Sequence, residues 1–245
     1  MSWCGEFALF LPTRQARASP TYAQDSAFFT TSDGVKIHYL TMGNSGSWVV
    51  LIHGYTDSAQ RMWFTTGIAP AQDVVELMDH LKIAKAHIHG YSMGGGLTGQ
   101  LLAMIPQRFI TAGLGGSGIA ETDPALRAQA AAMDDALPKP QCANAEAMNR
   151  FRARVTSLNP TGRVAPPVAA PAAADLRTLA IPIIAINGSF DAPYAKTHRL
   201  WREARVFENI VLPDKTHLTA IAVGGPMPPQ YVDAMSRFIG AFDEP

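Results

Sequence analysis

Apolar residues recur along the chain in two patterns, one typical of strands and one typical of helices. The run "SWVVLIHG" (residues 47–54) is nearly continuous in apolar and β-branched residues, which favours a central parallel strand covered on both faces. Further short apolar runs predict strands at residues 84–90, 108–116, 181–188 and 208–214. Upstream, "FFTTSDGVKIHYLTMG" (28–43) alternates β-forming residues around Asp33-Gly34, which predicts an antiparallel hairpin.

Segments with helical spacing lie between these runs. Residues 71–83 place their apolar side chains mainly along one side of a helix, and residues 94–105 predict an apolar helix that Pro106 ends. Further helical patterns cover residues 123–137, 143–158 and 228–242. Strands that alternate with helices predict an α/β fold with a mostly parallel sheet and helices on both faces.

Composition narrows the class of protein without changing this architecture. The chain has 245 residues, 47% of them apolar, which is enough for one substantial core. Twenty Lys and Arg balance twenty Asp and Glu without a basic run, so we expect no nucleic acid partner and no anionic membrane partner. A neutral or weakly polar small molecule fits better. No apolar stretch reaches the roughly 20 residues of a membrane-spanning helix.

The N-terminal residues and the cysteines bear on the compartment and on metal binding. In the N-terminal segment Arg14 and Arg17 follow a short apolar run, whereas a secretory signal has its positive charge first. We therefore expect a cytoplasmic protein, with a secreted or periplasmic location as the less favoured alternative. Cys4 and Cys142 allow at most one disulfide and have no metal-binding spacing, so we expect no metal.

The stretch "HIHGYSMGGG" (87–96) contains a G-x-S-x-G pattern centred on Ser92, with a predicted strand before it and a predicted helix after it. A strained strand-to-helix turn of this kind holds a nucleophilic serine, and its glycines, here Gly90 and Gly94, leave room where the helix approaches the strand. A serine hydroxyl is a poor nucleophile at neutral pH. It needs a base, usually a histidine that a carboxylate orients.

Two downstream residues fit these roles in the required order of serine, acid and histidine. Asp191 lies in "NGSFDAP", just past the end of a predicted strand, where open parallel sheets carry functional groups. His217 lies in the loop after the last predicted strand. Asp214 is the competing acid, but we expect it to be a turn residue because it lies so close to His217 in the sequence. We expect His53 and His89 to support loops and not to react.

The motifs "LIHGYTDSAQRMW", "GYSMGGG", "INGSFD" and "DKTHL" occur in this order and together resemble the successive signatures of the α/β-hydrolase fold family. The resemblance covers the hydrolase core, residues 28–118 and 178–245. It implies that residues 119–177 form a small helical lid with an Ala/Pro-rich connection, and it leaves residues 1–27 as an N-terminal extension.

The resemblance also implies an activity and a set of roles. The chain would be a serine hydrolase that cleaves small-molecule carboxylic esters through an acyl-enzyme, with no cofactor. Ser92 would be the nucleophile, His217 the base and Asp191 the orienting acid, while the backbone N–H groups of Tyr55 and Met93 would form the oxyanion hole. Two aromatic side chains are candidates for contact with the substrate: Trp63 and Phe190.

The chain departs from the family between the His53-Gly54 loop and the Ser92 turn. In the family a further strand lies here, whereas this sequence passes directly from the loop into the helix at residues 71–83, with a junction at Ala69-Pro70-Ala71. A missing strand would leave a sheet position unprotected, so a homodimer is one expected arrangement.

Two alternative functions stay open. Gly113, Gly115 and Gly118 satisfy G-x-G-x-x-G after a predicted strand, which is a pattern of dinucleotide-binding oxidoreductases. This alternative is less favoured because that motif opens a helix directly, whereas here the helical pattern starts near Asp123. The other alternative keeps the hydrolase fold without its chemistry, as a catalytically impaired protein that binds a small ligand.

Overall fold

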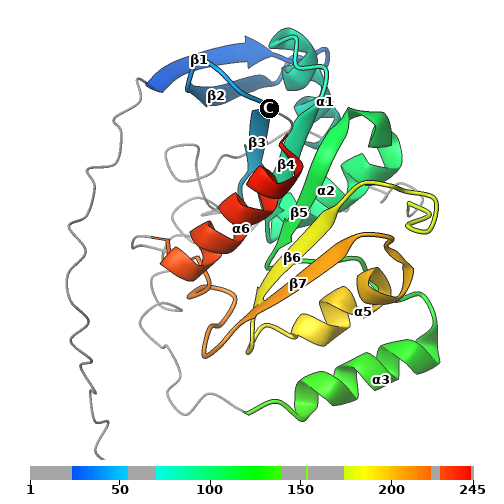
Figure 1. Cartoon of the computed structure of the whole chain (residues 1–245). Coiled ribbons are helices and arrows are strands. Elements are labelled where there is room, and N and C mark those ends of the chain that lie inside the picture. The colour runs from blue at the N-terminus through cyan, green and yellow to red at the C-terminus, as the bar shows by residue number, and fades with distance from the viewer. Residues whose placement is uncertain (1–23, 55–69, 139–152, 154–173, 222–226, 244–245) are drawn as a thin grey trace, which may run out of the picture.

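The computed structural model describes residues 24–54, 70–138, 153, 174–221 and 227–243 (Figure 1). Its strands are β1 (Gln24–Thr30), β2 (Lys36–Met42), β3 (Trp48–Ile52), β4 (Ala86–Tyr91), β5 (Phe109–Gly115), β6 (Ile183–Gly188) and β7 (Phe207–Leu212). Its helices are α1 (Pro70–His80), α2 (Met93–Met104), α3 (Pro124–Asp135), α5 (Pro193–Glu203) and α6 (Pro229–Phe242), and a short 3-10 helix covers Pro106–Arg108. Tyr55, Trp63, both cysteines and all of the helix predicted at 143–158 except residue 153 lie outside the described residues.

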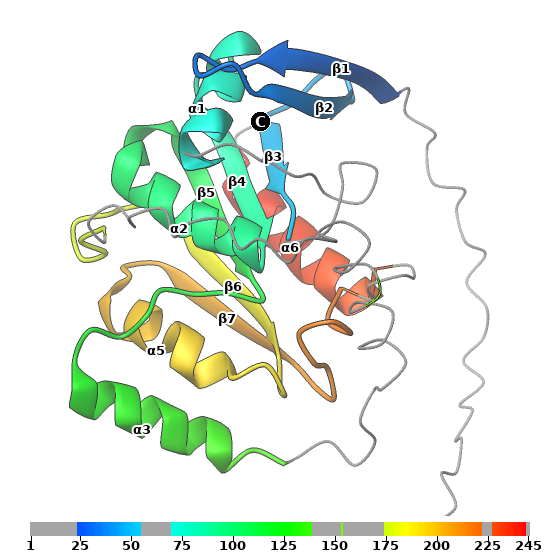
Figure 2. The same cartoon turned by 180° about the vertical axis from the view of Figure 1, so that it is seen from behind.

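The main sheet has five parallel strands in the order β3-β4-β5-β6-β7. Helix α6 lies across one face, and α1, α2 and α5 lie on the opposite face, as the front and back views show (Figures 1 and 2). Helix α3 packs on the outer side of α5. The predicted architecture, a mostly parallel sheet with helices on both faces, is therefore confirmed.

The two faces of the sheet bury two separate apolar cores, because successive side chains of a strand point to opposite faces. In β6, Ile183 and Ala185 belong to the core shared with α1, α2 and α5. Ile184 and Ile186 belong to the core under α6, which also contains Tyr91. Strand β4 is buried along its whole length and lies between these two cores.

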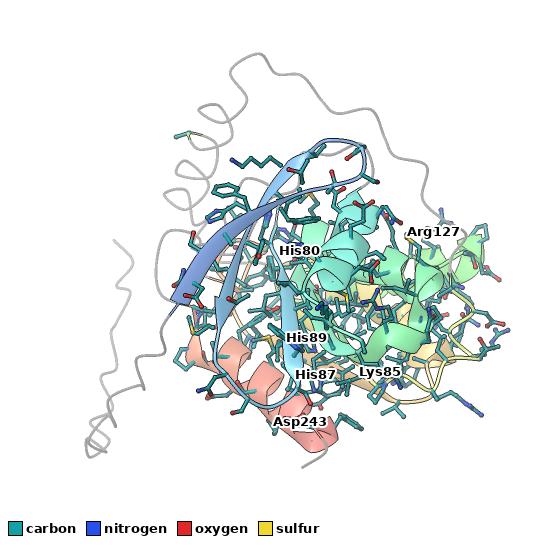
Figure 3. All side chains as sticks on the ribbon, turned by 90° about the horizontal axis from the view of Figure 1, so that it is seen from above. His80, Lys85, His87, His89, Arg127 and Asp243 are labelled. Atoms are coloured by element: carbon teal, nitrogen blue, oxygen red, sulfur yellow. The ribbon has the colours of Figure 1, made fainter. Side chains whose placement is uncertain are left out.

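Strand β4 is buried although it carries two histidines, and one hydroxyl contacts both rings. The Thr111 hydroxyl lies 2.9 Å from His87 Nδ1 and 3.0 Å from His89 Nε2. Burial lowers the pKa of His87, and it lowers the pKa of His89 to about 4. Both rings are therefore neutral at neutral pH. The other ring nitrogen of His87 lies 3.6 Å from a carboxylate oxygen of Asp243, just beyond α6 (Figure 3).

The N-terminal hairpin forms as predicted but builds its own two-stranded sheet. Strands β1 and β2 pair antiparallel, and Gly34 in their connection has a φ of 87°, a conformation that favours glycine. The hairpin docks on α1, where the N–H and hydroxyl of Ser32 each donate to the Glu76 carboxylate over 2.7 Å. The Phe29 ring also stacks on His80.

The prediction that residues 47–54 form the centre of the sheet is wrong, since β3 is its edge. Val49 and Leu51 are 40% and 49% exposed. Among the described residues, β3 pairs only with β4, because the hairpin pairs with itself. The sequence departure before the Ser92 turn predicted an unprotected sheet position but did not assign it to residues 47–54. Within the same part of the chain, no helix has both the length and the apolar character to cross a bilayer.

Candidate active site

Ser92 lies on a sharp turn between β4 and α2, at the carboxyl edge of the sheet. Its φ of 54° and ψ of −111° are strained for a residue with a side chain. Two backbone hydrogen bonds hold this conformation: the Ser92 N–H donates to the Gly115 carbonyl over 2.7 Å, and its carbonyl accepts from the Gly96 N–H over 3.0 Å. The turn therefore projects the hydroxyl from the end of a buried strand, as the sequence predicts.

The glycines on either side of Ser92 are required by close backbone contacts. A Cβ atom at Gly90 would lie 2.1 Å from the carbonyl oxygen of Gly94, and one at Gly94 would lie 2.0 Å from the carbonyl oxygen of Ile52. No side chain fits at these distances without moving the backbone. The G-x-S-x-G pattern therefore reflects the close approach of α2 to the ends of β3 and β4.

The three predicted side chains form a hydrogen-bonded row. His217 Nε2 lies 2.8 Å from Ser92 Oγ, and His217 Nδ1 lies 2.7 Å from Asp191 Oδ2. A carboxylate only accepts hydrogen bonds, so Nδ1 carries a proton, and Nε2 of the neutral ring is free to accept the serine proton. The His217 side chain is 35% exposed and Asp191 only 11%. A ligand can thus reach the serine and histidine end of the row.

The loops that carry Asp191 and His217 are hydrogen-bonded to each other. The Phe190 N–H donates to the Lys215 carbonyl, and the Asp191 N–H donates to the Gly188 carbonyl, both over 3.0 Å. Asp214 has a φ of 55° and donates its N–H to Ser189 Oγ, so this competing acid is an exposed turn residue. The separation of Asp191 and His217 is therefore fixed by backbone contacts.

Two residues that were not predicted from the sequence touch this row. The buried Tyr91 hydroxyl donates to the backbone carbonyl of His217 over 2.6 Å. Lys196, in the first turn of α5, places its Nζ 2.5 Å from Asp191 Oδ1. The motif offered a signal for Tyr91, which directly precedes the nucleophile. Lys196 had none, because α5 itself was not predicted.

Three other predicted residues lie within the described part of the chain. Met93 is the first residue of α2, and the first N–H groups of a helix have no acceptor inside it. Phe190 is half-buried next to Asp191. His53 is buried with its Nδ1 2.6 Å from the Gly54 carbonyl oxygen, and burial lowers the pKa of His53 to about 3. A neutral, enclosed imidazole is consistent with the expected loop-supporting role.

Protein atoms fill the space around the glycines of the G-x-G-x-x-G pattern. A Cβ at Gly113 would lie 2.1 Å from a ring nitrogen of His89, and one at Gly115 would lie 2.0 Å from the Tyr231 hydroxyl. One at Gly118 would lie 1.9 Å from the Lys196 carbonyl oxygen. These glycines admit neighbouring residues, and helix α3 begins only at Pro124. The dinucleotide alternative gains no support from this geometry.

The sequence was compared with protein families and with curated proteins. No family model matches the sequence. Over 114 residues the chain is 30% identical to a curated protein of Cupriavidus necator, the dihydrolipoyllysine-residue acetyltransferase component of an acetoin cleaving system. That match covers 35% of this chain and spans 30% of the length of the relative.

Solved structures match a larger share of the chain than the curated relative does. A hydrolase from Pseudomonas aeruginosa aligns with a TM-score of 0.61 at 18% identity, over 89% of this chain and 98% of its own. Naproxen esterase from Bacillus subtilis aligns with a TM-score of 0.62 at 18% identity, over 89% and 92%. A 2-hydroxy-6-oxo-6-phenylhexa-2,4-dienoate hydrolase from a Rhodococcus aligns with a TM-score of 0.58 at 19% identity, over 91% and 99%. The chain therefore has the α/β-hydrolase fold.

Proposed function

We propose that the protein is a serine hydrolase that cleaves carboxylic esters through a Ser92, His217 and Asp191 triad. The observation that carries the proposal is the continuous row from Ser92 Oγ through the His217 ring to Asp191, with separations of 2.8 and 2.7 Å. Hydrogen-bond contact of this length is what transfer of the serine proton to a base requires. The strained turn at Ser92 is a second, independent support.

The reaction proceeds in two steps that reuse the same groups. His217 Nε2 takes the proton of Ser92 as Oγ bonds to the ester carbonyl carbon, and the carbonyl becomes an oxyanion. The bond to the alcohol oxygen then breaks, and the imidazolium gives its proton to the departing alcohol. Water, deprotonated by His217, attacks the acyl-enzyme and releases the acid with Ser92 restored. Asp191 keeps the ring oriented throughout.

The N-terminus of α2 supplies a donor for the oxyanion. The Met93 N–H belongs to the first turn of that helix, where unpaired N–H groups and the helix dipole favour negative charge. We assign the second donor to Tyr55. Loss of one such donor costs roughly 3 to 4 kcal/mol of transition-state stabilisation.

The proposed substrate class rests on chemistry and on likeness. An ester carbonyl is reactive enough for a neutral serine activated by a histidine, and the similar structures include naproxen esterase. A second similar structure is a hydrolase of a hydroxy-oxo-phenylhexadienoate. We therefore propose small, neutral or weakly polar carboxylic esters. Trp63 and Phe190 are the proposed contacts to the substrate, and residues 119–177 the proposed lid.

A fluorophosphonate probe tests the proposal, since it forms a covalent adduct only with an activated serine. The purified protein is labelled and the modified residue is located by mass spectrometry, in parallel with Ser92→Ala and His217→Ala. The chain also offers a matched control, because Ser26 Oγ lies 2.6 Å from His38 Nε2 on the exposed hairpin, far from the strained turn. Ser26→Ala removes a serine in contact with a histidine but leaves the proposed site intact.

We expect labelling at Ser92 that is lost in Ser92→Ala, reduced at least 100-fold in rate in His217→Ala, and unchanged in Ser26→Ala. Hydrolysis of p-nitrophenyl esters is expected to follow the same order. A folded protein that neither labels at Ser92 nor hydrolyses any ester would contradict the proposal. That result would favour the alternative of a ligand-binding protein with a hydrolase fold.

A further inference from the structure

The Asp191 carboxylate has two charged or polar partners, one on each oxygen. Oδ2 lies 2.7 Å from His217 Nδ1, and Oδ1 lies 2.5 Å from the ammonium nitrogen of Lys196. The Asp191 and Lys196 side chains are only 11% and 25% exposed, so water screens this ion pair less than it screens a pair on the open surface. One carboxylate therefore joins the base of the row to a fixed cation.

Lys196 occupies a place where a lysine is not expected on local grounds. It lies in the first turn of α5, where the aligned peptide dipoles make a positive charge unfavourable. The N-terminus of α5 already has its anion, because the Asp134 carboxylate accepts from the N–H groups of Tyr194 and Ala195 over 2.9 and 2.8 Å. The contact that compensates for the position of Lys196 is its ion pair with Asp191.

The backbone of Lys196 is held as tightly as its side chain. Its carbonyl accepts from the Ile119 N–H over 3.1 Å. A Cβ at Gly118 would lie 1.9 Å from that same carbonyl oxygen, so the loop after β5 packs directly against it. The lysine side chain thus starts from a fixed backbone point beside the Asp191 carboxylate.

We propose that Lys196 is a positioning residue for the acid of the triad; this rests on the proposed function. The terminal torsion of an aspartate is broad, so a carboxylate held at one oxygen can turn away from its partner. With Oδ1 anchored by Lys196, Oδ2 stays directed at His217 Nδ1. The ring then keeps its Nδ1 proton and presents Nε2 to Ser92.

Substitution at Lys196 with chemical rescue tests the proposal. In a Cys4→Ser and Cys142→Ser background, Lys196→Cys is measured before and after alkylation with 2-bromoethylamine. The alkylated side chain has the reach and charge of lysine, with sulfur in place of one methylene. Lys196→Met removes the ammonium group while keeping a side chain of similar length, and Lys85→Met is the matched control. Lys85, labelled in Figure 3, is exposed and directly precedes β4, whereas Ser92 follows the other end of that strand.

We expect Lys196→Met and unalkylated Lys196→Cys to lower kcat for ester hydrolysis about 10- to 100-fold with KM changed less than twofold. Alkylation is expected to restore kcat to within threefold of the background protein, and Lys85→Met to leave it unchanged. An unchanged kcat in folded Lys196→Met would overturn the proposal. So would a loss that alkylation does not restore, because the amine would then not be the group that matters.

A spectroscopic readout keeps this test separate from the activity itself. The ¹⁵N chemical shifts of the His217 ring, assigned by comparison with His217→Ala, report which nitrogen carries the proton. Lys196→Met is expected to move the ring from the Nδ1–H form toward a mixture of tautomers. If the ring shifts are the same in both proteins, Lys196 does not position the acid. A wild-type protein without esterase activity would contradict the proposed function. The same spectra would still decide whether Lys196 positions Asp191.

Discussion

The Tyr91 hydroxyl donates a hydrogen bond to the backbone carbonyl of His217 over 2.6 Å, which joins the residue before Ser92 to the proposed base. The two rings also lie close, with centroids 5.3 Å apart. Burial raises the pKa of Tyr91 far above its ordinary value, so the hydroxyl remains protonated, and remains a donor, at any pH at which the protein works. One side chain therefore couples the strained turn to the loop after β7.

We expect Tyr91→Phe to lower kcat roughly 3- to 10-fold and stability by about 1 kcal/mol, because the His217 carbonyl loses a donor while the ring is kept. Steady-state kinetics with a p-nitrophenyl ester and thermal unfolding measure the two effects. Tyr39→Phe is the matched control, since the Tyr39 hydroxyl contacts His80 Nε2 over 3.3 Å outside the site. Equal effects of both substitutions on kcat would show that the hydrogen bond from Tyr91 to the His217 carbonyl does not support activity.

The glycines around Ser92 provide a prediction with an internal control. Gly90→Ala and Gly94→Ala each place a Cβ about 2 Å from a backbone oxygen, so we expect either to abolish labelling of Ser92 or to prevent folding. Gly96, in the same first turns of α2, has nothing within 4 Å of the corresponding position. Gly96→Ala is therefore expected to retain activity and to gain about 0.5 to 1 kcal/mol of stability, since alanine loses less backbone entropy in a helix. Thermal melts and labelling of the three variants decide this.

The three residues of the proposed triad could be singled out from the sequence because each is specified locally. The glycines that Ser92 needs are its neighbours in the chain, and Asp191 directly follows an apolar strand. Parallel strands bring their carboxyl ends to one edge, so the order of strands along the chain was enough to bring these residues near His217.

The features that could not be predicted depend on contacts between distant parts of the chain. The apolar run of β3 is that of a strand covered on both faces, but its position at the edge depends on which strand lies next to it. Helix α5 receives the cap at its N-terminus from Asp134, 60 residues earlier in the chain, so its own sequence carries no such signal. Lys196 could not be assigned without that helix.

Glu121 is expected to make the folded protein less stable as the pH falls into the acid range. Burial alone would raise the pKa of this carboxyl, but hydrogen bonds from His198, Arg202 and the backbone N–H groups of Asp123 and Thr122 outweigh it and hold the pKa at about 2. A carboxyl with a lowered folded pKa contributes stability above its unfolded pKa of 4.5, and this contribution is lost as the pH falls toward 2.

We therefore expect Glu121→Gln to lower the melting temperature at pH 7 and the difference from wild type to shrink steadily below pH 4.5. Thermal melts of both proteins from pH 7 to pH 3 provide the measurement. Asp25→Asn, which neutralises an exposed carboxylate on β1, is the control and should show no such convergence. A constant difference at all pH values would mean that Glu121 acts through packing alone.

The charge of Asp73 is expected to destabilise the folded protein, which is the opposite of the effect of the Glu121 charge. Asp73 is 3% exposed, and burial, with Asp33 and Glu76 nearby, raises its pKa to about 6 from an unfolded value of 3.8. One carboxylate oxygen has no hydrogen-bond partner. Folding therefore carries a penalty that is absent below pH 3.8, grows between pH 3.8 and 6, and is complete above pH 6.

Asp73→Asn removes this buried charge and should stabilise the protein at pH 8 by about 3 kcal/mol, because the pKa rises from 3.8 to about 6 and each tenfold change in a protonation equilibrium corresponds to roughly 1.4 kcal/mol. The gain should disappear near pH 4, where the wild-type carboxyl is protonated in the folded protein. Denaturant unfolding of the two proteins at pH 8 and pH 4 measures both values. A variant less stable than wild type at pH 8 would show that Asp73 is stabilised as an anion, since its charge would then contribute more to the folded state than its burial costs.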